Sequence, residues 1–409
     1  MKSKMKSKPS ISIILFTKWL ATFGAFLQSA ALPIIIFKLT GSSSLLSITF
    51  FVETLPWLFF APLFSNIITS HFSSKQAYIA CCVLKGILTF FLGLLINRYI
   101  CVILIFFLLG ILNSMTAPIY STLLKTNSNE GTLSNILGIS LGVDDLVSIV
   151  APLIVSILLS NGCHAVLFIY GNSVILLLTG VLSIRLPVES QQVNLKQKKF
   201  HIKESFCKIR VQIGYLSSPR IRYLVLNEFC RSLVEGMCIP LLIVYVASIS
   251  MDQDRIFTIG ETLGAVAQVI MSILYIFLVK KFKSEALINI GAILMCISFI
   301  GLTAPGLSSI RFYFISLVFL GMGIAIRQLI SENLLISSFE PEILSEVISI
   351  YNAVIAFAYL IGYLISSFQT QVSNLSLFFI IGMILLLFPK GVNLLLKGKT
   401  KWTQQTKQG

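Results

Sequence analysis

The sequence predicts an all-α polytopic membrane protein with about twelve transmembrane helices in two pseudo-symmetric six-helix bundles. Apolar segments of about 20 residues recur along the whole chain of 409 residues, and a helix of that length crosses a bilayer. Charged residues make up 11% of the chain, whereas a soluble domain carries about a quarter. One long polar and basic stretch, residues 185–221, divides the apolar segments into two groups of six.

Turn-like or charged residues bound each apolar segment and set the expected spans. The first segment is too long for the apolar region of a signal peptide, so we expect it to be the first transmembrane helix. We expect an N-terminal half at 1–184, a basic cytoplasmic linker at 185–221, a C-terminal half at 222–396 and a basic cytoplasmic tail at 397–409. The expected spans are 11–37, 45–70, 77–96, 100–124, 135–160, 165–184, 222–249, 256–279, 286–303, 309–337, 345–368 and 375–396.

Lysine and arginine are distributed unevenly between the two sides of the predicted bundle. One side carries 22 of these residues and the other carries 4, and basic loops stay in the cytoplasm during membrane insertion. We therefore expect a multi-pass protein of the cell membrane, the inner membrane of a bacterium, with both termini in the cytoplasm. The net charge of +15 has the same origin, so we expect a lipid bilayer and no nucleic acid as a partner.

Short matches at a nearly constant spacing indicate that one half of the chain duplicates the other. The tripeptide Glu-Thr-Leu at 53–55 recurs at 261–263, and Leu-Gly at 109–110 recurs at 320–321. The offsets are 208 and 211 residues, which agrees with the division into six and six spans. Two parallel six-helix halves form a known transporter plan.

The sequence contains no pattern that holds a metal, a nucleotide or a covalent catalyst. Its three histidines are scattered, its eight cysteines form no CxxC pair, and it has no glycine-rich phosphate loop. We expect no metal, no cofactor and no enzymatic activity, which leaves secondary transport driven by an ion gradient. A non-transporting membrane sensor or partner protein is the alternative from another class.

Ionisable residues inside the apolar segments are the candidate functional residues, because a charge in the bilayer core is costly and usually faces a cavity, a partner or a pathway. Acids outnumber bases, and an unpaired buried carboxylate tends to bind a proton. The acids are Glu53, Asp144, Asp145, Glu228, Glu235, Glu261 and Glu332, and the bases are Lys18, Lys85, Arg231 and Arg327.

Glu228, Arg231 and Glu235 form the first candidate cluster. Their spacings of three and four residues place them on one helix face, where Arg231 can pair with either acid but hardly neutralise both. One interpretation is a static ion pair that lets the helix pack. The other is a proton or substrate site controlled by competition for Arg231, and Glu235 is then the preferred coupling residue because it lies deeper in the span.

Asp144 and Asp145 form the second candidate site. Neighbours on a helix point about 100° apart, so we expect one to face a cavity and the other a helix interface. Two like charges in apolar surroundings favour protonation of one of them, as proton coupling requires. The alternative is that both lie nearer the aqueous end of the helix and stay solvated.

The other charged residues inside the apolar segments do not form a cluster in the sequence. Glu53 and Glu261 are expected near the outer ends of their helices at matched depths, where they line an outer vestibule or remain solvated. Arg327 and Glu332 lie too far apart around one helix to pair, so each needs a partner on another helix. We expect Lys18 to extend toward the cytoplasmic face.

The two halves and the basic linker resemble the major facilitator superfamily. Residues 30–64, AALPIIIFKLTGSSSLLSITFFVETLPWLFFAPLF, resemble the branch that contains bacterial macrolide efflux proteins and the enterobactin exporter. The resemblance implies the major facilitator fold and an outward direction of transport. With the excess of acids in the spans, we expect proton-coupled efflux of amphipathic molecules such as antibiotics by alternating access, in a monomeric antiporter. The matching elements are Leu32-Pro33, Leu39 to Ser42, Leu55-Pro56 and Ala61-Pro62.

The chain departs from two motifs of the superfamily it resembles. In the cytoplasmic gate loop after the second helix, Lys75 is retained, whereas Thr69 stands about where an aspartate belongs. In the fifth helix, Ala151-Pro152 keeps only the proline of a glycine–proline pair. These departures indicate a divergent exporter or one with weakened coupling. The alternative function is dedicated export of a siderophore, peptide or metabolite, or import of a nutrient.

Overall fold

The computed structural model describes residues 8–71, 74–127, 130–186, 214, 218–303, 309–339, 341–368 and 375–405. Throughout this part of the chain the secondary structure is helical, which confirms the predicted fold class. Internal contacts divide the chain into two compact units, Met1–Phe206 with Phe257–Thr262 and Cys207–Ile256 with Leu263–Gly409. The main division falls inside the predicted linker.

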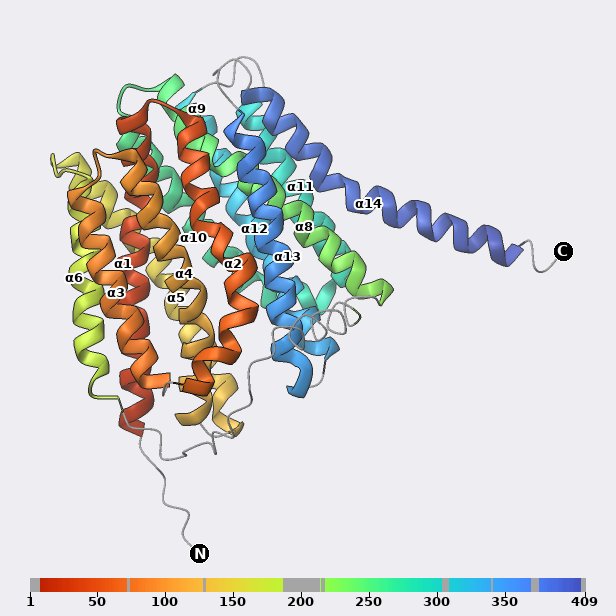
Figure 1. The fold of residues 1–409 in the computed structure, drawn as a ribbon. Coiled ribbons are helices and arrows are strands. Elements are labelled where there is room, and N and C mark those ends of the chain that lie inside the picture. Colours follow the sequence, from red (N-terminus) through yellow and green to blue (C-terminus); the bar gives the residue numbers. More distant parts are fainter. Residues whose placement is uncertain are drawn as a thin grey trace, which may run out of the picture. The chain divides into compact units, whose positions relative to one another are not determined.

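Figure 1 shows the helices in chain order, coloured from red to blue. Those before the linker are α1 (Lys8–Thr40), α2 (Ser43–His71), α3 (Ser74–Leu94), α4 (Tyr99–Asn127), α5 (Glu130–Ser160) and α6 (Val166–Ser183). Those after it are α8 (Pro219–Cys238), the 3-10 turn η1 (Ile239–Leu241), α9 (Leu242–Ile249), α10 (Gln253–Lys281), α11 (Ser284–Thr303), α12 (Ile310–Ser338), α13 (Pro341–Ser367) and α14 (Leu375–Gln405).

The helices have the lengths and apolar character of membrane spans. Among the described residues, nine helices can cross a membrane, with α8, η1 and α9 counted together as one. Three more helices contain shorter apolar segments: Ser43–Phe59 in α2, Leu146–Ser160 in α5 and Leu375–Gly391 in α14. The chain is therefore a multi-pass membrane protein. The helix ends lie within five residues of the predicted spans, except that α14 continues past residue 396 to Gln405.

The same pairs of helices pack together in both units. In the first unit α1 packs against α5 and α6, and α3 packs against α4 and α6. In the second unit α8 packs against α13 and α14, and α11 packs against α12 and α14. Helices at corresponding places in the two halves thus have corresponding neighbours, which is the pseudo-symmetry that the sequence repeat predicts.

Two glycines show how the repeat aligns in space. A Cβ added to Gly110 would lie 2.2 Å from the carbonyl oxygen of Glu53, and one added to Gly321 would lie 2.2 Å from that of Gly264. Only glycine allows backbones to approach this closely. The two contacts match at an offset of 211 residues, so the counterpart of Glu53 is Gly264. Glu261 lies three residues before that counterpart, about one helical turn away.

The motif from Leu39 to Ser42 ends α1 and begins α2. Gly41 adopts a φ of 60°, and its N–H donates to the Phe37 carbonyl oxygen over 2.8 Å, as in the left-handed cap of a helix C-terminus. The Leu45 N–H then donates to Ser42 Oγ over 3.3 Å, which caps the start of α2. The motif therefore forms a tight turn between two spans.

Pro240 interrupts the span that carries the first candidate cluster. Sequence analysis predicted one helix over 222–249, whereas the structure has α8, η1 and α9 in succession over Ile221–Ile249. Proline lacks the N–H that would continue the helical hydrogen bonds, and its ring clashes with the preceding turn. Glu228 and Glu235 both lie on α8, before this break.

Each unit has its own buried core. In the first unit the core joins α1, α3 and α4 and includes Ile14, Cys81, Cys82 and Leu123. The two cysteines are free and buried there, in keeping with a role in packing. In the second unit the core joins the start of α8 with parts of α10, α11, α12 and α13.

Candidate functional site

α8 carries a buried acid–base–acid cluster formed by Glu228, Arg231 and Glu235. Arg231 Nε donates to Glu228 Oε2 over 2.7 Å, and Arg231 Nη1 donates to Glu235 Oε1. The exposed fraction of the arginine side chain is 6%, and those of the two acids are 2% and 4%. Arg231 bonds both acids at once, whereas the sequence predicted only that it could pair with either. Its guanidinium has donors on two edges, and the acids lie one turn to either side.

α13 supplies a second partner for Glu235. The Tyr359 hydroxyl donates to Glu235 Oε2, so both oxygens of this carboxylate are bonded. The helices can approach because Gly362 faces α8, where an added Cβ would lie 2.3 Å from the Leu233 carbonyl oxygen. Sequence analysis missed Tyr359, because a tyrosine in an apolar span carries no local signal of its partner.

Arg327 brings a second cation from α12. Its side chain has no exposed surface, and its Nη2 donates to the backbone oxygen of Asn227 on α8 over 2.6 Å. Its guanidinium also interacts electrostatically with Glu228 and Glu235. The partner on another helix that Arg327 was expected to need is therefore α8. Two guanidinium groups beside two carboxylates sum to zero formal charge, which lowers the cost of burying all four.

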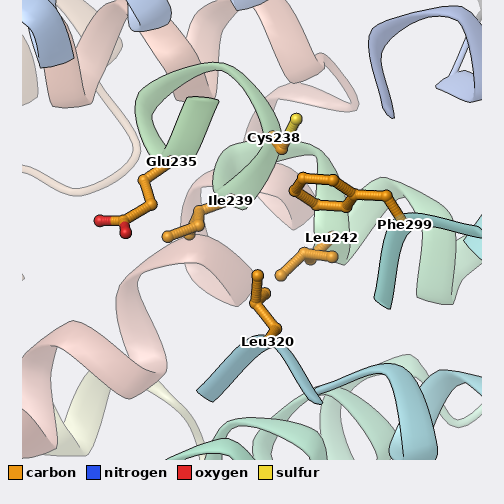
Figure 2. A pocket seen from close by; sticks show the side chains of 6 residues that line it. All are labelled: Glu235, Cys238, Ile239, Leu242, Phe299 and Leu320. Atoms are coloured by element: carbon orange, nitrogen blue, oxygen red, sulfur yellow. The ribbon is translucent and has the colours of Figure 1, made fainter. Parts of the chain in front are cut away.

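Glu235 also lines an apolar pocket in the second unit. Figure 2 shows its carboxylate at one side and the apolar side chains gathered at the other. The surface of this small pocket is apolar, and the carboxylate points away from it, toward Arg231 and Tyr359. The lining residues are Glu235, Cys238, Ile239, Leu242, Phe299 and Leu320.

The first unit has a separate charged site, which we call the Lys18 site and which comprises Lys18, Tyr120, Ser140 and Asp144. Lys18 Nζ on α1 donates to Asp144 Oδ2 on α5 over 2.5 Å and to Ser140 Oγ over 2.6 Å. The same nitrogen lies 5.1 Å from the centre of the Tyr120 ring on α4, within cation–π range. The expectation that Lys18 extends to the cytoplasmic face was wrong, because packing of α1 against α5 brings an acid within its reach.

The other predicted acids are less closely engaged. Glu53 on α2 and Glu261 on α10 are each half-buried. Glu332 accepts a hydrogen bond from Gln328 Nε2 over 3.1 Å, a partner on its own helix rather than on another. These three acids are therefore weaker candidates than Glu235 and Asp144.

The predicted gate loop is described only in part. Lys75 Nζ donates to the Leu186 carbonyl oxygen over 2.5 Å, which ties the start of α3 to the end of α6. The side chains of Thr69 and Asp145 lie outside the described residues. In the described ranges no group of three or more His, Cys, Asp or Glu side chains could hold a metal ion.

Comparison of the sequence with known families identifies the chain. The family model of the Major Facilitator Superfamily matches residues 14–260, more than half of the chain. The chain belongs to the Major Facilitator Superfamily. No curated protein sequence matches this superfamily member significantly.

Solved structures show how closely this superfamily member keeps a transporter fold. The nucleoside transporter NupG has a TM-score of 0.75 at 12% identity, over 94% of this chain and 98% of that one. A POT family transporter in complex with 5-aminolevulinic acid has a TM-score of 0.70 at 14% identity, over 97% and 98%. A bacterial homologue of the iron transporter ferroportin in an inward-facing state has 0.67 at 15%, over 95% and 98%. At these identities the likeness shows the fold alone.

Proposed function

We propose that this superfamily member is a secondary active transporter that exports amphipathic small molecules, such as antibiotics, in exchange for protons. The position of Glu235 carries the proposal: its carboxylate is bonded by α8 and α13, and the same side chain lines an apolar pocket. The resemblance of residues 30–64 to macrolide and enterobactin exporters supports the outward direction. The proposal includes a monomer in the bacterial cell membrane with both termini in the cytoplasm.

Charge balance gives a reason for a proton to change the conformation. Glu228, Glu235, Arg231 and Arg327 sum to zero formal charge while both acids are ionised. A proton on Glu235 leaves two guanidinium groups beside one carboxylate, and a buried site has no solvent to screen that excess. Proton binding therefore favours a conformation with different partners, and such differential affinity is what shifts a two-state equilibrium.

Substrate can engage the same carboxylate. In a conformation that opens this pocket and turns the carboxylate away from Arg231 and Tyr359, an amphipathic molecule would place its apolar part against Phe299 and Leu320 and its polar part against Glu235. It would then compete with a proton for one group. Release of the molecule on one side of the membrane and uptake of a proton there are linked by this competition, which is the essential step of exchange.

The first test is growth inhibition by a broad antibiotic panel in a pump-deficient bacterium. It compares the wild type with Glu235→Gln and, as a matched control, Asp252→Asn, which changes an exposed acid directly before α10. We expect resistance to some compounds in the wild type and the control, and its loss in Glu235→Gln at equal expression. In liposomes, an imposed pH gradient should drive flux of those compounds only through the first two proteins.

Two results would change the proposal. Full gradient-driven flux through Glu235→Gln would exclude Glu235 as the coupling residue. Absence of both resistance and flux for every compound, with the wild type well folded, would replace broad export by a dedicated cargo. That cargo would be a siderophore, peptide or metabolite for export, or a nutrient for import, or the chain would be a membrane sensor.

A further inference from the structure

We propose that Asp144, Ser140 and Tyr120 form a binding site for an organic cation, and that the Lys18 ammonium occupies this site when no such cation is bound. The inference names the charge of the transported molecule. It rests on the proposed function for the claim that the bound cation is cargo. The binding claim itself rests on the geometry of the Lys18 site.

The Lys18 site combines three groups that bind an ammonium ion. The Asp144 carboxylate accepts a charge-assisted hydrogen bond over 2.5 Å, and the Ser140 hydroxyl accepts a second over 2.6 Å. The Tyr120 ring presents its face at 5.1 Å. Asp144 Oδ1 is buried and has no hydrogen-bond partner in the described part of the chain, so the carboxylate can accept a further donor. An organic cation with N–H groups and an apolar body matches these features.

The exposure of the site allows exchange of one cation for another. The side chains of Lys18 and Asp144 are each 23% exposed, whereas Arg231 and its two acids are 6% exposed or less. Partly exposed ion pairs contribute little to stability, because solvent screens them and the long side chain loses freedom. Lys18 can therefore leave Asp144 at a smaller cost than Arg231, which would leave two buried acids uncompensated.

Comparison with the second unit shows which residue types of the Lys18 site occur in both halves and which occur in one. At the offset of 211 residues, Tyr120 and Ser140 correspond to Ser331 on α12 and Tyr351 on α13. A tyrosine and a serine therefore stand at corresponding positions of the fourth and fifth helices in both halves, with the two residue types exchanged. The position that corresponds to Asp144 is Ile355. Packing of these helices does not require an acid there, so the acid has another role.

The test measures binding of ethidium, a fluorescent aromatic cation, to purified protein in detergent without any gradient. Lys18→Met removes the competing cation and keeps the carboxylate, so we expect ethidium to bind about three- to tenfold more tightly than to the wild type. Lys18→Met/Asp144→Asn should lose that gain. Because it removes both charges together, it leaves no unpaired charge to disturb folding. Fluorescein, an anionic dye, serves as the control ligand.

Several outcomes would overturn the inference. Ethidium binding that is equal or weaker in Lys18→Met than in the wild type would do so, as would equal binding by the single and the double variant. Loss of fluorescein binding in Lys18→Met would assign Lys18 to an anionic ligand instead. Absence of ethidium binding to the wild type and to Lys18→Met would also exclude the cation site.

A second measurement uses the unaltered protein. If ethidium displaces the Lys18 ammonium, acylation of Lys18 by an amine-reactive ester should increase several-fold when the dye is added. Lys283, an exposed lysine between α10 and α11, is the internal control and should react equally in both samples. Bound ethidium with unchanged acylation of Lys18 would contradict displacement. If either Lys18 experiment fails, the test of transport with Glu235→Gln is unaffected. If the Glu235→Gln test fails, the results on cation binding still hold.

Discussion

The hydroxyl of Tyr359 on α13 donates a hydrogen bond to the carboxylate of Glu235 on α8, across 124 positions of sequence. This contact joins the first and fifth helices of the second half at an ionisable group. A change at the carboxylate therefore acts on two helices at once, and the contact is the first that we would remove.

Tyr359→Phe should lower both stability and transport. The substitution removes one hydrogen bond to a charged group, which is worth about 1.5–3 kcal/mol. We expect a lower melting temperature in detergent and a several-fold lower antibiotic flux in liposomes. Tyr170→Phe, a tyrosine on α6 of the first unit, is the control and should change neither. Equal flux through both variants would show that the Tyr359 contact is dispensable.

Arg231→Met should destabilise the second unit strongly. It leaves Glu228 and Glu235 buried without the cation that bonds both, a loss of about 3–5 kcal/mol. The measurement is the yield of monodisperse protein and its melting temperature. Combining Arg231→Met with Glu228→Gln and Glu235→Gln removes the uncompensated charges and should restore much of the yield. If the triple variant is as unstable as the single one, packing of the arginine rather than its charge is what matters.

Arg327 and Glu228 should be energetically coupled. The guanidinium of Arg327 interacts with Glu228 but makes its hydrogen bond to the Asn227 backbone. We expect Arg327→Met to cost less in a Glu228→Gln background than in the wild type. The double-mutant coupling energy should be about 1–3 kcal/mol, measured by denaturant unfolding in mixed micelles. Strictly additive effects would mean that the two charges stabilise the fold independently.

Gly110→Ala and Gly321→Ala should both be destabilising. Each added Cβ would meet a backbone oxygen at 2.2 Å, and the helices would have to separate at a cost of about 1–3 kcal/mol. Gly171→Ala on α6 is the control, because an added Cβ there has no atom within 4 Å. It should be neutral or slightly stabilising. Thermal melting of the three variants would show whether the predicted order holds.

Properties that depend on local pattern were predictable from the sequence. Hydropathy identified the spans, and helix periodicity brought Glu228, Arg231 and Glu235 to one face. Pro240 was visible in the sequence, yet a proline inside an apolar run does not state whether it bends or breaks a span. In the structure this proline lies in one 3-10 turn, η1, between α8 and α9.

Contacts between distant helices were not predictable. Lys18 and Asp144 lie 126 positions apart, and a lysine ten residues into a helix fits an extension toward water as well as an ion pair. Tyr359 and Asn227 carry no charge, so nothing in the sequence marked them as partners of Glu235 and Arg327. The Glu-Thr-Leu match has an offset of 208 residues and the glycine contacts one of 211, so the sequence repeat aligns the two halves only to within one helical turn.

The glycine contacts at Gly110 and Gly321 separate what the two halves share from what they do not. In both halves a helix backbone comes so close to its neighbour that no side chain fits at this position. The ionisable residues differ, because the first half has an interhelical lysine–aspartate pair and the second has an arginine that bonds two glutamates. The shared contact belongs to the architecture, and the charged residues are what distinguish one half from the other.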